Sequence, residues 1–449
     1  MTDARSRNET TSHRGGFGNL GGEERGFIDR SFRERIILVG IETANEKSKE
    51  SIDAQLDELQ QLVSTAGADV VHRIIQRRTS PDAGTYIGKG KAREIFKLAE
   101  DLDVDTVVFN NELTPAQQYN LEKIFKRSAI DRTAVILDIF AQNASTPEGK
   151  SQVELAQLNY LLPRLRGTGS TLSQQAGGIG TRGPGETKLE IDRRRLVRRI
   201  HKLQKQMAGI SSTRANQSKR RRKSVNQSIA IVGYTNAGKS TLLNALTQST
   251  NDALVANRLF ATLDPLTRKV QLPGGEKIFI SDTVGFVRSL PHHLVEAFKT
   301  TLDVVIEADL LVHVVDGSKA NPYGDIVAVR SVLKDIGADS VPELLVFNKS
   351  DRADPSIHLM EYPNSVSVSA RTGDGIDKMM KSISELLRSQ LDVYELEIPL
   401  ARGDLIAQVH REAQVLIEDV QGEMLIMRVR LDSFAYARLG EFIRTERNQ

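Results

Sequence analysis

The chain has 449 residues, 39% of them hydrophobic, and a formal net charge of +3. This length allows about two to four domains, and so small a net charge argues neither for nor against a nucleic-acid partner. The chain contains no cysteine, which excludes disulfides, cysteine metal sites and thiol catalysis. No apolar run reaches the roughly 18 residues that cross a bilayer, and the first residues lack the apolar region of a secretory signal. We therefore expect a cytoplasmic protein without a membrane span, and we leave partial membrane association open.

Residues 1–33 are rich in glycine, arginine and serine and are predicted to form a disordered tail. Within the tail, Arg14–Gly18 resembles an RGG segment that contacts RNA, although the composition favours a plain solvated tail. Strand and helix patterns then alternate over residues 34–145, which predicts an N-terminal α/β domain with a parallel sheet. The expected strands are Arg35–Gly40, Asp69–Ile75 and Asp105–Phe109, and the expected helices are Ser48–Thr65, Ala92–Glu100 and Pro115–Phe125, the last capped by Thr114. A second nucleotide site in this domain stays open.

Residues 146–224 are predicted to form a helical hairpin followed by a basic linker. Apolar residues at helical spacing predict one helix over Lys150–Leu165, and a second helix is expected over Thr187–Met207. The Gly-rich stretch Gly167–Gly185 between them has two interpretations that the residues alone leave open. It is either a flexible connection or a tip that enters a groove of folded RNA. Such a tip would use the polar residues beside the glycines, which are Arg164, Arg166, Thr168, Thr181 and Arg182.

The second helix of the hairpin and the linker after it are strongly basic. The basic residues are Arg193, Arg194, Arg195, Arg198, Arg199, Lys202 and Lys205 in the helix, and Lys219–Lys223 in the linker. A basic run is usually only solvated surface, but acidic residues are nearly absent here, so the local field is large. The pattern favours contact with nucleic-acid phosphates. A further hypothesis is that the linker acts as a hinge that carries nucleotide state between the hairpin and the next domain.

The most informative stretch of the chain is a phosphate-binding pattern, G-x-x-x-x-G-K-S. It lies between an apolar strand, Ile229–Val232, and a helix-like run, Thr241–Leu246, which is the context that such a loop requires. Backbone N–H groups of the loop would bind phosphate, Lys239 would neutralise the β- and γ-phosphates, and Ser240 would ligate Mg²⁺. The residues of this loop that we predict to bind nucleotide are Gly233, Tyr234, Thr235, Asn236, Ala237, Gly238, Lys239, Ser240 and Thr241.

Three further motifs follow at the carboxyl ends of expected strands, where ligands bind in α/β sheets. Asp282, Thr283, Val284 and Gly285 follow Lys277–Ser281; Asn348, Lys349, Ser350 and Asp351 follow Leu344–Phe347; Ser369, Ala370 and Arg371 follow Val366–Val368. Asp282 is predicted to hold Mg²⁺ through water, and the Gly285 amide to reach the γ-phosphate. The Asn-Lys-x-Asp pattern selects guanine, because Asp351 accepts two N–H groups that adenine cannot supply. The motifs together predict a GTP-binding domain over residues 225–390.

A fifth segment lies between the phosphate loop and Asp282. Its residues are Phe260, Ala261, Thr262, Leu263 and Asp264. Thr262 is predicted to close on Mg²⁺ and the γ-phosphate when GTP is present. The predicted catalytic residues are then Lys239, Thr262 and Gly285, and the predicted metal ligands are Ser240, Thr262 and Asp282.

Phe286 departs from the Ras-like pattern of this kind of site. Ras-like proteins have a glutamine here that orients the attacking water, and a phenylalanine side chain cannot form that hydrogen bond. We therefore expect a slow intrinsic rate of hydrolysis that a partner raises.

A small C-terminal α/β domain is predicted over residues 391–449. Its expected elements are a helix over Gly403–Glu412 and strands over Ala413–Glu418 and Glu423–Leu431. The predicted fold class is therefore α/β throughout: an N-terminal α/β domain with a basic helical hairpin, a P-loop GTPase domain with a doubly wound sheet, and this small domain.

From about Ile36 to its end, the chain resembles the HflX family of ribosome-associated GTPases, in the translation-factor-related group. The stretches that carry the resemblance are Gly233–Thr241, Phe260–Asp264, Asp282–Val287, Leu290–His292, Gly177–Gly180 and Arg182–Thr187. The resemblance implies GTP and GDP as ligands, Mg²⁺ as cofactor, a monomer, and binding to the large ribosomal subunit and its rRNA. It also implies a role in splitting or rescuing stalled ribosomes under stress.

Two other functions stay open on the sequence. One is an assembly or hibernation factor that acts on free 50S subunits. The other is an RNA-binding module gated by nucleotide with negligible turnover, which Phe286 makes conceivable.

Overall fold

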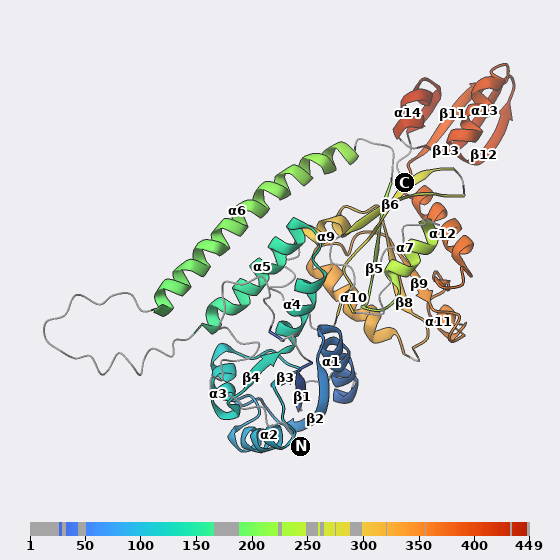
Figure 1. Cartoon of the computed structure of the whole chain (residues 1–449). Helices are drawn as coiled ribbons and strands as arrows, with labels where there is room; N and C mark the ends of the chain where they lie inside the picture. Colours follow the sequence, from blue (N-terminus) through green and yellow to red (C-terminus); the bar gives the residue numbers. More distant parts are fainter. Residues whose placement is uncertain are drawn as a thin grey trace, which may run out of the picture. The chain divides into compact units, whose positions relative to one another are not determined.

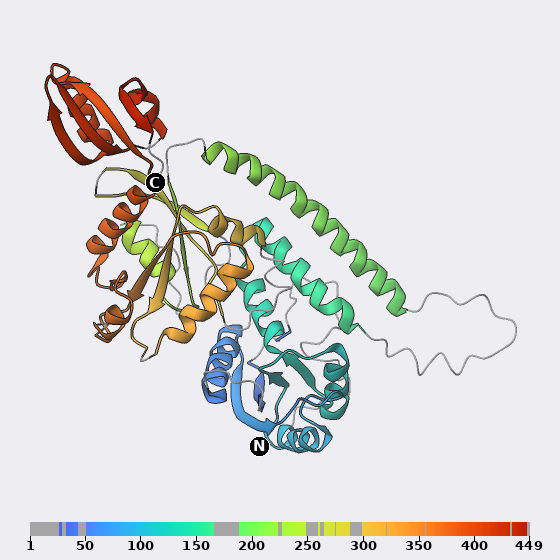
Figure 2. The same ribbon diagram turned by 180° about the vertical axis from the view of Figure 1, so that it is seen from behind.

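The computed structural model describes residues 27–28, 33–43, 51–165, 188–222, 227–247, 259–260, 265–273, 275–287, 299–319, 321–354, 356–431 and 433–446. The chain divides into two compact units. The first contains the N-terminal region as far as Ile210, together with Leu259 and Phe260, and the second contains the GTPase and C-terminal elements. The predicted α/β fold class is confirmed, and Figures 1 and 2 show its elements from opposite sides.

The N-terminal domain is built on a four-stranded parallel sheet in the order β2-β1-β3-β4. The strands are β1 (Arg35–Thr43), β2 (Asp69–Arg78), β3 (Thr106–Phe109) and β4 (Ser128–Asp131). Helices α2 (Lys89–Asp101) and α3 (Pro115–Phe125) share a core with one face of the sheet. Helix α1 (Ile52–Ala66) packs on β1 and β2 and against α4 (Arg132–Asn143). Successive residues of a strand face opposite sides, so Val39 enters the α2–α3 core while Gly40 contacts Ile52 of α1.

Strand β4 and helix α4 are not among the predicted elements, for a physical reason. β4 is only four residues long, and all residues of α4 from Arg132 to Phe140 are buried. A helix buried on all sides shows no polar face, so its sequence lacks the 3.6-residue period by which helices are recognised. The N-cap becomes evident in the structure, where the Asp131 side chain accepts a hydrogen bond from the N–H of Ala134.

Phe27 and Ile28 also differ from expectation, because the sequence analysis places them in the tail and both are buried. Their N–H groups donate to the two carboxylate oxygens of the buried Asp138, over 2.8 and 2.7 Å. The Phe27 ring packs edge-on against Tyr160, with 5.3 Å between ring centroids. These two residues are therefore part of the N-terminal core.

The predicted hairpin consists of α5 (Pro147–Leu161), which continues as the short helix η1 (Leu162–Arg164), and α6 (Lys188–Arg222). The two helices share an apolar core of Leu155, Leu158, Leu196, Ile200 and Leu203. Arg199 of α6 also donates two hydrogen bonds to Glu154 of α5, over 2.8 and 2.6 Å. Helix α6 is longer than expected, so Lys219–Arg222 continue the helix rather than forming an extended linker.

The GTPase domain contains a six-stranded sheet in the order β10-β9-β8-β5-β7-β6, in which only β6 runs antiparallel to its neighbour. The strands are β5 (Ser228–Gly233), β6 (Leu266–Gln271), β7 (Lys277–Asp282), β8 (Leu310–Asp316), β9 (Glu343–Asn348) and β10 (Val366–Ser367). The helices are α7 (Lys239–Thr247), α9 (Lys299–Ile306), α10 (Tyr323–Asp335), α11 (Ser356–Glu361) and α12 (Ile376–Ser389). Helices α7 and α12 cover one face through a shared apolar core, and α10 contributes Ile326 to a cluster on the other. The parallel strands bring the loops at their carboxyl ends to one edge of the sheet.

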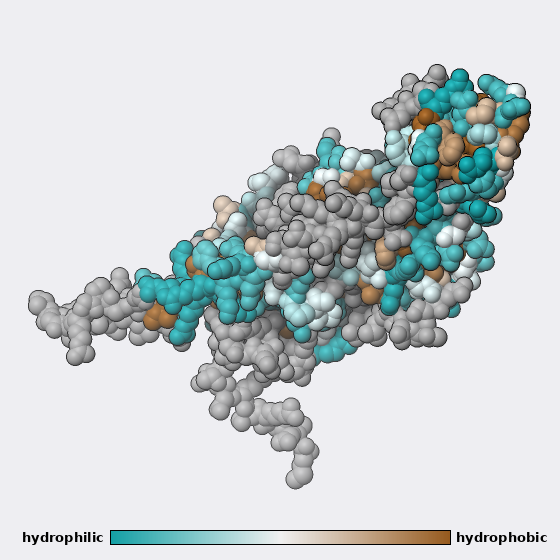
Figure 3. All heavy atoms as spheres, turned by 90° about the horizontal axis from the view of Figure 1, so that it is seen from above, coloured by the Kyte–Doolittle hydropathy of each residue, from teal (hydrophilic) through white to brown (hydrophobic). Residues whose placement is uncertain are grey.

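The C-terminal domain is an antiparallel sheet in the order β12-β13-β11-β14. Its elements are β11 (Val393–Pro399), α13 (Gly403–Glu412), β12 (Gln414–Gln421), β13 (Met424–Arg430), α14 (Ser433–Leu439), η4 (Gly440–Phe442) and β14 (Ile443–Glu446). The sequence predicted α13, β12 and β13 but neither β11 nor β14. On the edge strand β12, Ile417 and Val420 are exposed, and Figure 3 shows apolar residues among polar ones on this domain.

A search of the described helices for a long, apolar segment capable of crossing a membrane finds none.

Candidate functional site

The phosphate-binding pattern forms the connection from β5 to α7, as its sequence predicts. Gly233 ends the strand, and Lys239 begins the helix. Two glycines are required by close contacts: a Cβ on Gly233 would lie 2.2 Å from the carbonyl oxygen of Val314, and one on Gly238 would lie 2.3 Å from Nδ2 of Asn348. Gly238 also has φ +96°, a conformation that L side chains rarely adopt. The loop therefore has the tight backbone that lets N–H groups converge on a phosphate.

Lys239 is buried, and its ammonium group is held by the loop itself. Nζ donates to the carbonyl oxygens of Gly233 and Tyr234, over 3.1 and 2.9 Å. An ammonium group has three N–H donors, so one remains for a phosphate oxygen. Burial lowers the pKa of Lys239 to about 8, although the nearby Asp282 charge opposes the shift. A bound phosphate would favour the protonated form and raise that pKa again.

The residues predicted to hold a metal lie beside this lysine. The Ser240 hydroxyl donates to Oδ2 of the buried Asp282 over 2.6 Å. A hydroxyl and a carboxylate are the hard oxygen ligands that Mg²⁺ prefers, so this pair fits the ion. Gly285 follows in the same segment, where a Cβ would lie only 3.0 Å from Nζ of Lys239 and 2.9 Å from a methyl group of Thr235. A side chain at this position would crowd both Thr235 and Lys239, so glycine is the residue that fits.

Phe286 is a structural residue of the loop, which the sequence analysis did not foresee. Its side chain is 1% exposed. Its N–H donates to the carbonyl of Gly233 over 3.1 Å, and its carbonyl accepts from the N–H of Thr235 over 2.8 Å. This parallel bridge ties the Asp282–Gly285 segment to the phosphate loop. The one sequence feature that pointed to this structural role is the apolar phenylalanine at a position where Ras-like proteins have a polar glutamine.

The guanine motifs come together around Asn348. Its amide Nδ2 donates to the carbonyl of Ala237 over 2.8 Å, and its Oδ1 accepts from the N–H of Ala370 over 2.9 Å. One buried side chain thus joins the phosphate loop to the loop after β10. Asp351 accepts a hydrogen bond from the Ser369 hydroxyl over 2.8 Å, which lowers the pKa of that carboxyl. The carboxylate therefore stays ionised and able to accept from a guanine edge.

The structure brings most predicted site residues together within one domain. They are Gly233 to Thr241, Asp282 to Gly285, Asn348 to Asp351 and Ser369 to Arg371. Ala261, Thr262, Leu263 and Asp264 lie outside the described residues. Phe260 is described, and it contacts Phe140 and Asn143 of α4.

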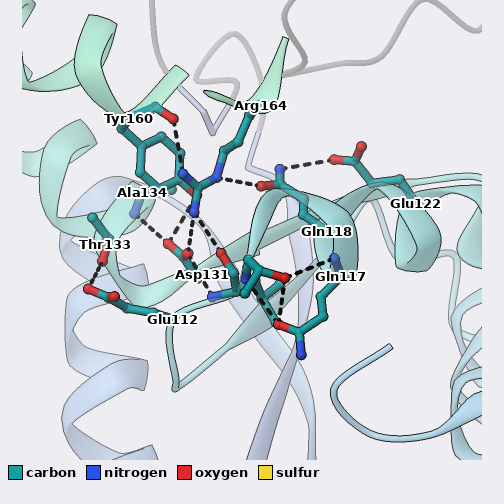
Figure 4. Close-up of polar contacts among 11 residues, drawn as sticks. Glu112, Gln117, Gln118, Glu122, Asp131, Thr133, Ala134, Tyr160 and Arg164 are labelled. Atoms are coloured by element: carbon teal, nitrogen blue, oxygen red, sulfur yellow. Dashed lines mark hydrogen bonds and ion pairs between the residues drawn. The ribbon is translucent and has the colours of Figure 1, made fainter. Parts of the chain in front are cut away.

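Arg164, which one of the two interpretations of the Gly-rich stretch placed at an RNA-contacting tip, is directed into the N-terminal domain (Figure 4). Its guanidinium lies 3.6 Å from the centre of the Tyr160 ring and 3.3 Å from Oδ2 of the fully buried Asp131. It also donates to Gln118 over 2.9 Å and to the carbonyl of Leu113 over 2.7 Å. These bonds engage the guanidinium in holding the end of η1, so Arg164 is not available to RNA phosphates.

The fold and this site define a P-loop GTP-binding protein. Three family models match the chain: "GTP-binding GTPase N-terminal" over residues 53–141, "GTP-binding GTPase Middle Region" over residues 143–221, and "50S ribosome-binding GTPase" over residues 228–349. The chain is similar to "GTPase HflX" of Lacrimispora saccharolytica, with 43% identity over 414 residues, covering 92% of this chain and 97% of that protein. It is also similar to "GTPase HflX" of Escherichia coli K12, with 41% identity over 383 residues, covering 84% and 88%.

The chain therefore belongs to the HflX family of GTPases, and GTP hydrolysis is its reaction. Among solved structures, a GTP-binding protein from the archaeon Sulfolobus solfataricus in complex with GDP is similar at 24% identity. That likeness covers 79% of this chain and 99% of the other, with a TM-score of 0.40.

Proposed function

We propose that this GTPase binds the large ribosomal subunit and couples GTP binding and hydrolysis to the splitting or rescue of stalled ribosomes in the cytoplasm. The family supports the ribosome as partner, since the matching model of the GTPase domain describes 50S ribosome-binding GTPases. The observation that carries the proposal for this chain is the exposed basic face of α6.

That basic face follows from the helical arrangement of α6. Leu196, Ile200 and Leu203 recur at helical spacing and are buried against α5. The opposite face, at the same spacing, carries four exposed basic residues: Arg194, Arg198, Lys202 and Lys205. Figure 3 shows a hydrophilic surface over this part of the helix. Such a row of positive charge would attract the phosphates of an RNA backbone, and binding would release counterions.

Hydrolysis would depend on positioning and electrostatics at the phosphate end of the site. Lys239 would direct its third N–H at the β- and γ-phosphates, and the Gly285 amide would donate to the γ-phosphate. Ser240, Asp282 and Thr262 would hold Mg²⁺, which neutralises charge that develops on the phosphate oxygens. No hydrogen-bonding side chain is available at Phe286 to orient the water. We therefore propose a slow intrinsic rate and ribosomal contacts that supply this orientation.

The first experiment is GTP hydrolysis by the full chain alone, with purified 50S subunits and with 70S ribosomes, beside a Lys239→Ala control. A rise of ten-fold or more, about 1.4 kcal/mol off the barrier, is expected with 70S ribosomes, and Lys239→Ala should abolish it. A rise with free 50S subunits alone would favour an assembly or hibernation factor. No rise with either particle would contradict ribosomal activation and favour the nucleotide-gated RNA-binding module.

The basic face can be tested with a charge-matched control. Arg198→Gln/Lys202→Gln should weaken 50S binding about ten-fold or more and flatten its salt dependence, because each lost phosphate contact reduces counterion release. Lys378→Gln/Lys381→Gln removes the same charge from exposed positions of α12 and should leave binding unchanged. Equal effects of the two double variants would show that net charge, not this helix face, attracts the ribosome.

A further inference from the structure

A lysine–carboxylate pair joins the guanine motif to the neighbouring strand of the GTPase sheet. Lys349 donates from Nζ to Oδ2 of Asp316 over 2.6 Å. Asp316 is the last residue of β8, and its register partner at the end of β9 is Asn348, the residue before the lysine. Only 15% of the lysine side chain and 14% of the aspartate side chain are exposed. The pair therefore lies at the carboxyl ends of two adjacent strands, inside one compact unit.

Both oxygens of the Asp316 carboxylate have partners. Oδ1 accepts from the N–H and the hydroxyl of Ser318, over 3.1 and 2.6 Å, while Oδ2 accepts from Lys349. Burial alone would raise the pKa of Asp316, but the bonds from Lys349 and Ser318 outweigh it, so the pKa lies below its ordinary value. The carboxylate stays ionised, and the bonds from Ser318 fix its orientation. Asp316 thus offers the ammonium group a partner in a fixed place.

The backbone of Lys349 is also held in an unusual conformation. It has φ +68°, which places a long side chain in the left-handed region. Such a conformation is costly for a residue other than glycine and persists only where surrounding contacts hold it. The carbonyl of Lys349 accepts from the N–H of Arg352 over 2.9 Å, and the N–H of Gly317 donates to the carbonyl of Asn348 over 2.8 Å. These bonds tie the turn after β9 to the turn after β8.

These contacts decide where the stem of Lys349 lies. The backbone of the residue follows β9 and its ammonium group is at the end of β8, so the four-carbon stem runs along the sheet edge between the two strands. Asp351, which is proposed to accept from the guanine edge, is two residues further on, so the two Cα atoms are at most about 7 Å apart. The methylene groups of a lysine form an apolar surface against which a flat ring can pack. A stem that is fixed in advance loses no rotamer freedom when a base arrives.

We propose that Asp316 is a positioning residue for the guanine base. It holds the Lys349 side chain along the sheet edge before the nucleotide binds, so that binding does not have to order this side chain. GTP and GDP carry the same base, so both affinities depend on Asp316 to the same extent, and the rate of hydrolysis at saturating GTP does not. The proposal rests on the base-binding role proposed for Asn348–Asp351 and is independent of ribosome binding.

The test is a double-mutant cycle on the full chain without ribosomes. Asp316→Asn removes the charge that holds the ammonium group and keeps the size of the side chain. Lys349→Met removes the ammonium group and keeps an unbranched stem. The double variant has neither charge, so no unpaired charge is left to destabilise it. Asp325→Asn is the matched control, because Asp325 on α10 is buried and also pairs with a lysine, Lys319, over 2.5 Å. For each variant, GTP and GDP affinities, the single-turnover rate at saturating GTP and the thermal midpoint are measured.

Asp316→Asn should lower the affinities for GTP and GDP by the same factor, about three- to ten-fold, because binding must then order the lysine side chain. The rate at saturating GTP should keep its wild-type value, and Asp325→Asn should leave both affinities unchanged. The double variant should bind no more weakly than the weaker of the two single variants, since both residues act through one contact.

Three results would overturn the proposal. Additive losses in the cycle would show that Asp316 and Lys349 act independently. A changed ratio of GTP to GDP affinity would show that Asp316 acts at the phosphate end. Equal losses of affinity in Asp316→Asn and Asp325→Asn, with lower thermal midpoints in both, would show a general structural role.

A failure of this inference can be told from a failure of the base-binding assignment on which it rests. If Asp351→Asn leaves the preference for guanine unchanged, the assignment of Asn348–Asp351 is wrong and the inference fails with it. If Asp351→Asn changes that preference while Asp316→Asn leaves both affinities at the wild-type value, only the role of Asp316 is wrong. Since no ribosome is present, the absence of ribosomal activation would not affect either result.

Discussion

The two ends of the nucleotide site are built in different ways. At the guanine end, Asn348 uses its amide to join the phosphate loop to Ala370, and Ser369 holds the carboxylate of Asp351. At the phosphate end, Lys239 keeps one donor in reserve, and Phe286 is buried where a water-orienting side chain would stand. Under the proposed function, the GTPase domain alone recognises the base, whereas hydrolysis needs further groups that the ribosome supplies.

The largest effect should come from the guanine end. Asp351→Asn should weaken GTP binding about 10³-fold or more, because the carboxylate acceptor is replaced by an amide whose N–H groups face the guanine N–H groups. The same variant should bind xanthosine triphosphate, whose added carbonyl accepts from the new amide, and should hydrolyse it at the wild-type GTP rate. Equilibrium binding and turnover with both nucleotides measure this. If the variant binds xanthosine triphosphate tightly but hydrolyses it much more slowly than the wild type hydrolyses GTP, base recognition and hydrolysis are not separate.

The next effect should come from the phosphate end. Lys239→Ala removes a preorganised donor from a buried site and should lower the hydrolysis rate about 10²- to 10³-fold. Single-turnover assays at saturating GTP separate this loss from weaker binding. Lys378→Ala on the exposed surface of α12 serves as control and should leave the rate unchanged. If Lys239→Ala lowers only the affinity for GTP and not the single-turnover rate, then Lys239 serves nucleotide binding rather than hydrolysis.

A smaller effect should appear in the pH dependence of binding. The free protein has a Lys239 pKa of about 8 because of burial, and bound phosphate raises it. Between these two values binding takes up a proton, so affinity is constant below pH 8 and falls as the pH rises above it. GTP affinity at pH 9 should be about ten-fold lower than at pH 7. Calorimetry in buffers of different ionisation enthalpy should detect uptake near one proton at pH 9, and no uptake there would contradict the shifted pKa.

The smallest effect on rate should come from restoring the residue type of Ras-like proteins. Phe286→Gln should not raise the intrinsic rate, because this side chain is buried and its backbone is bonded to the phosphate loop. The main result should be a loss of stability of about 2–4 kcal/mol, from a lost ring and a buried amide. Hydrolysis assays and denaturant unfolding measure the two quantities. A clear rate increase would show that the side chain at this position reaches the attacking water.

The sequence correctly predicted where the short motifs lie in the fold. The phosphate loop, the Asp282 segment and the guanine motifs each follow a recognisable apolar strand, and parallel strands bring such loops to one edge of a sheet. The sequence did not predict features that depend on which residues become buried. Helix α4 has no polar face to reveal it, and one of the two open interpretations made Arg164 an exposed RNA contact. Three partners of Arg164, namely Gln118, Leu113 and Asp131, lie 33 to 51 residues away in the chain, so local sequence could not show them.

The sequence by itself determined the class of site, the order of its motifs and the alternating α/β architecture, because these depend on residue types at short spacings. The tertiary structure alone decided which polar side chains are already engaged, as with Arg164, and that Phe286 serves the loop through its backbone. It alone also decided that Phe260 meets Asn143, a residue 117 positions earlier in the chain. Contacts of this kind arise when distant segments pack around a shared core, and no local pattern of residues encodes which distant side chain will complete them.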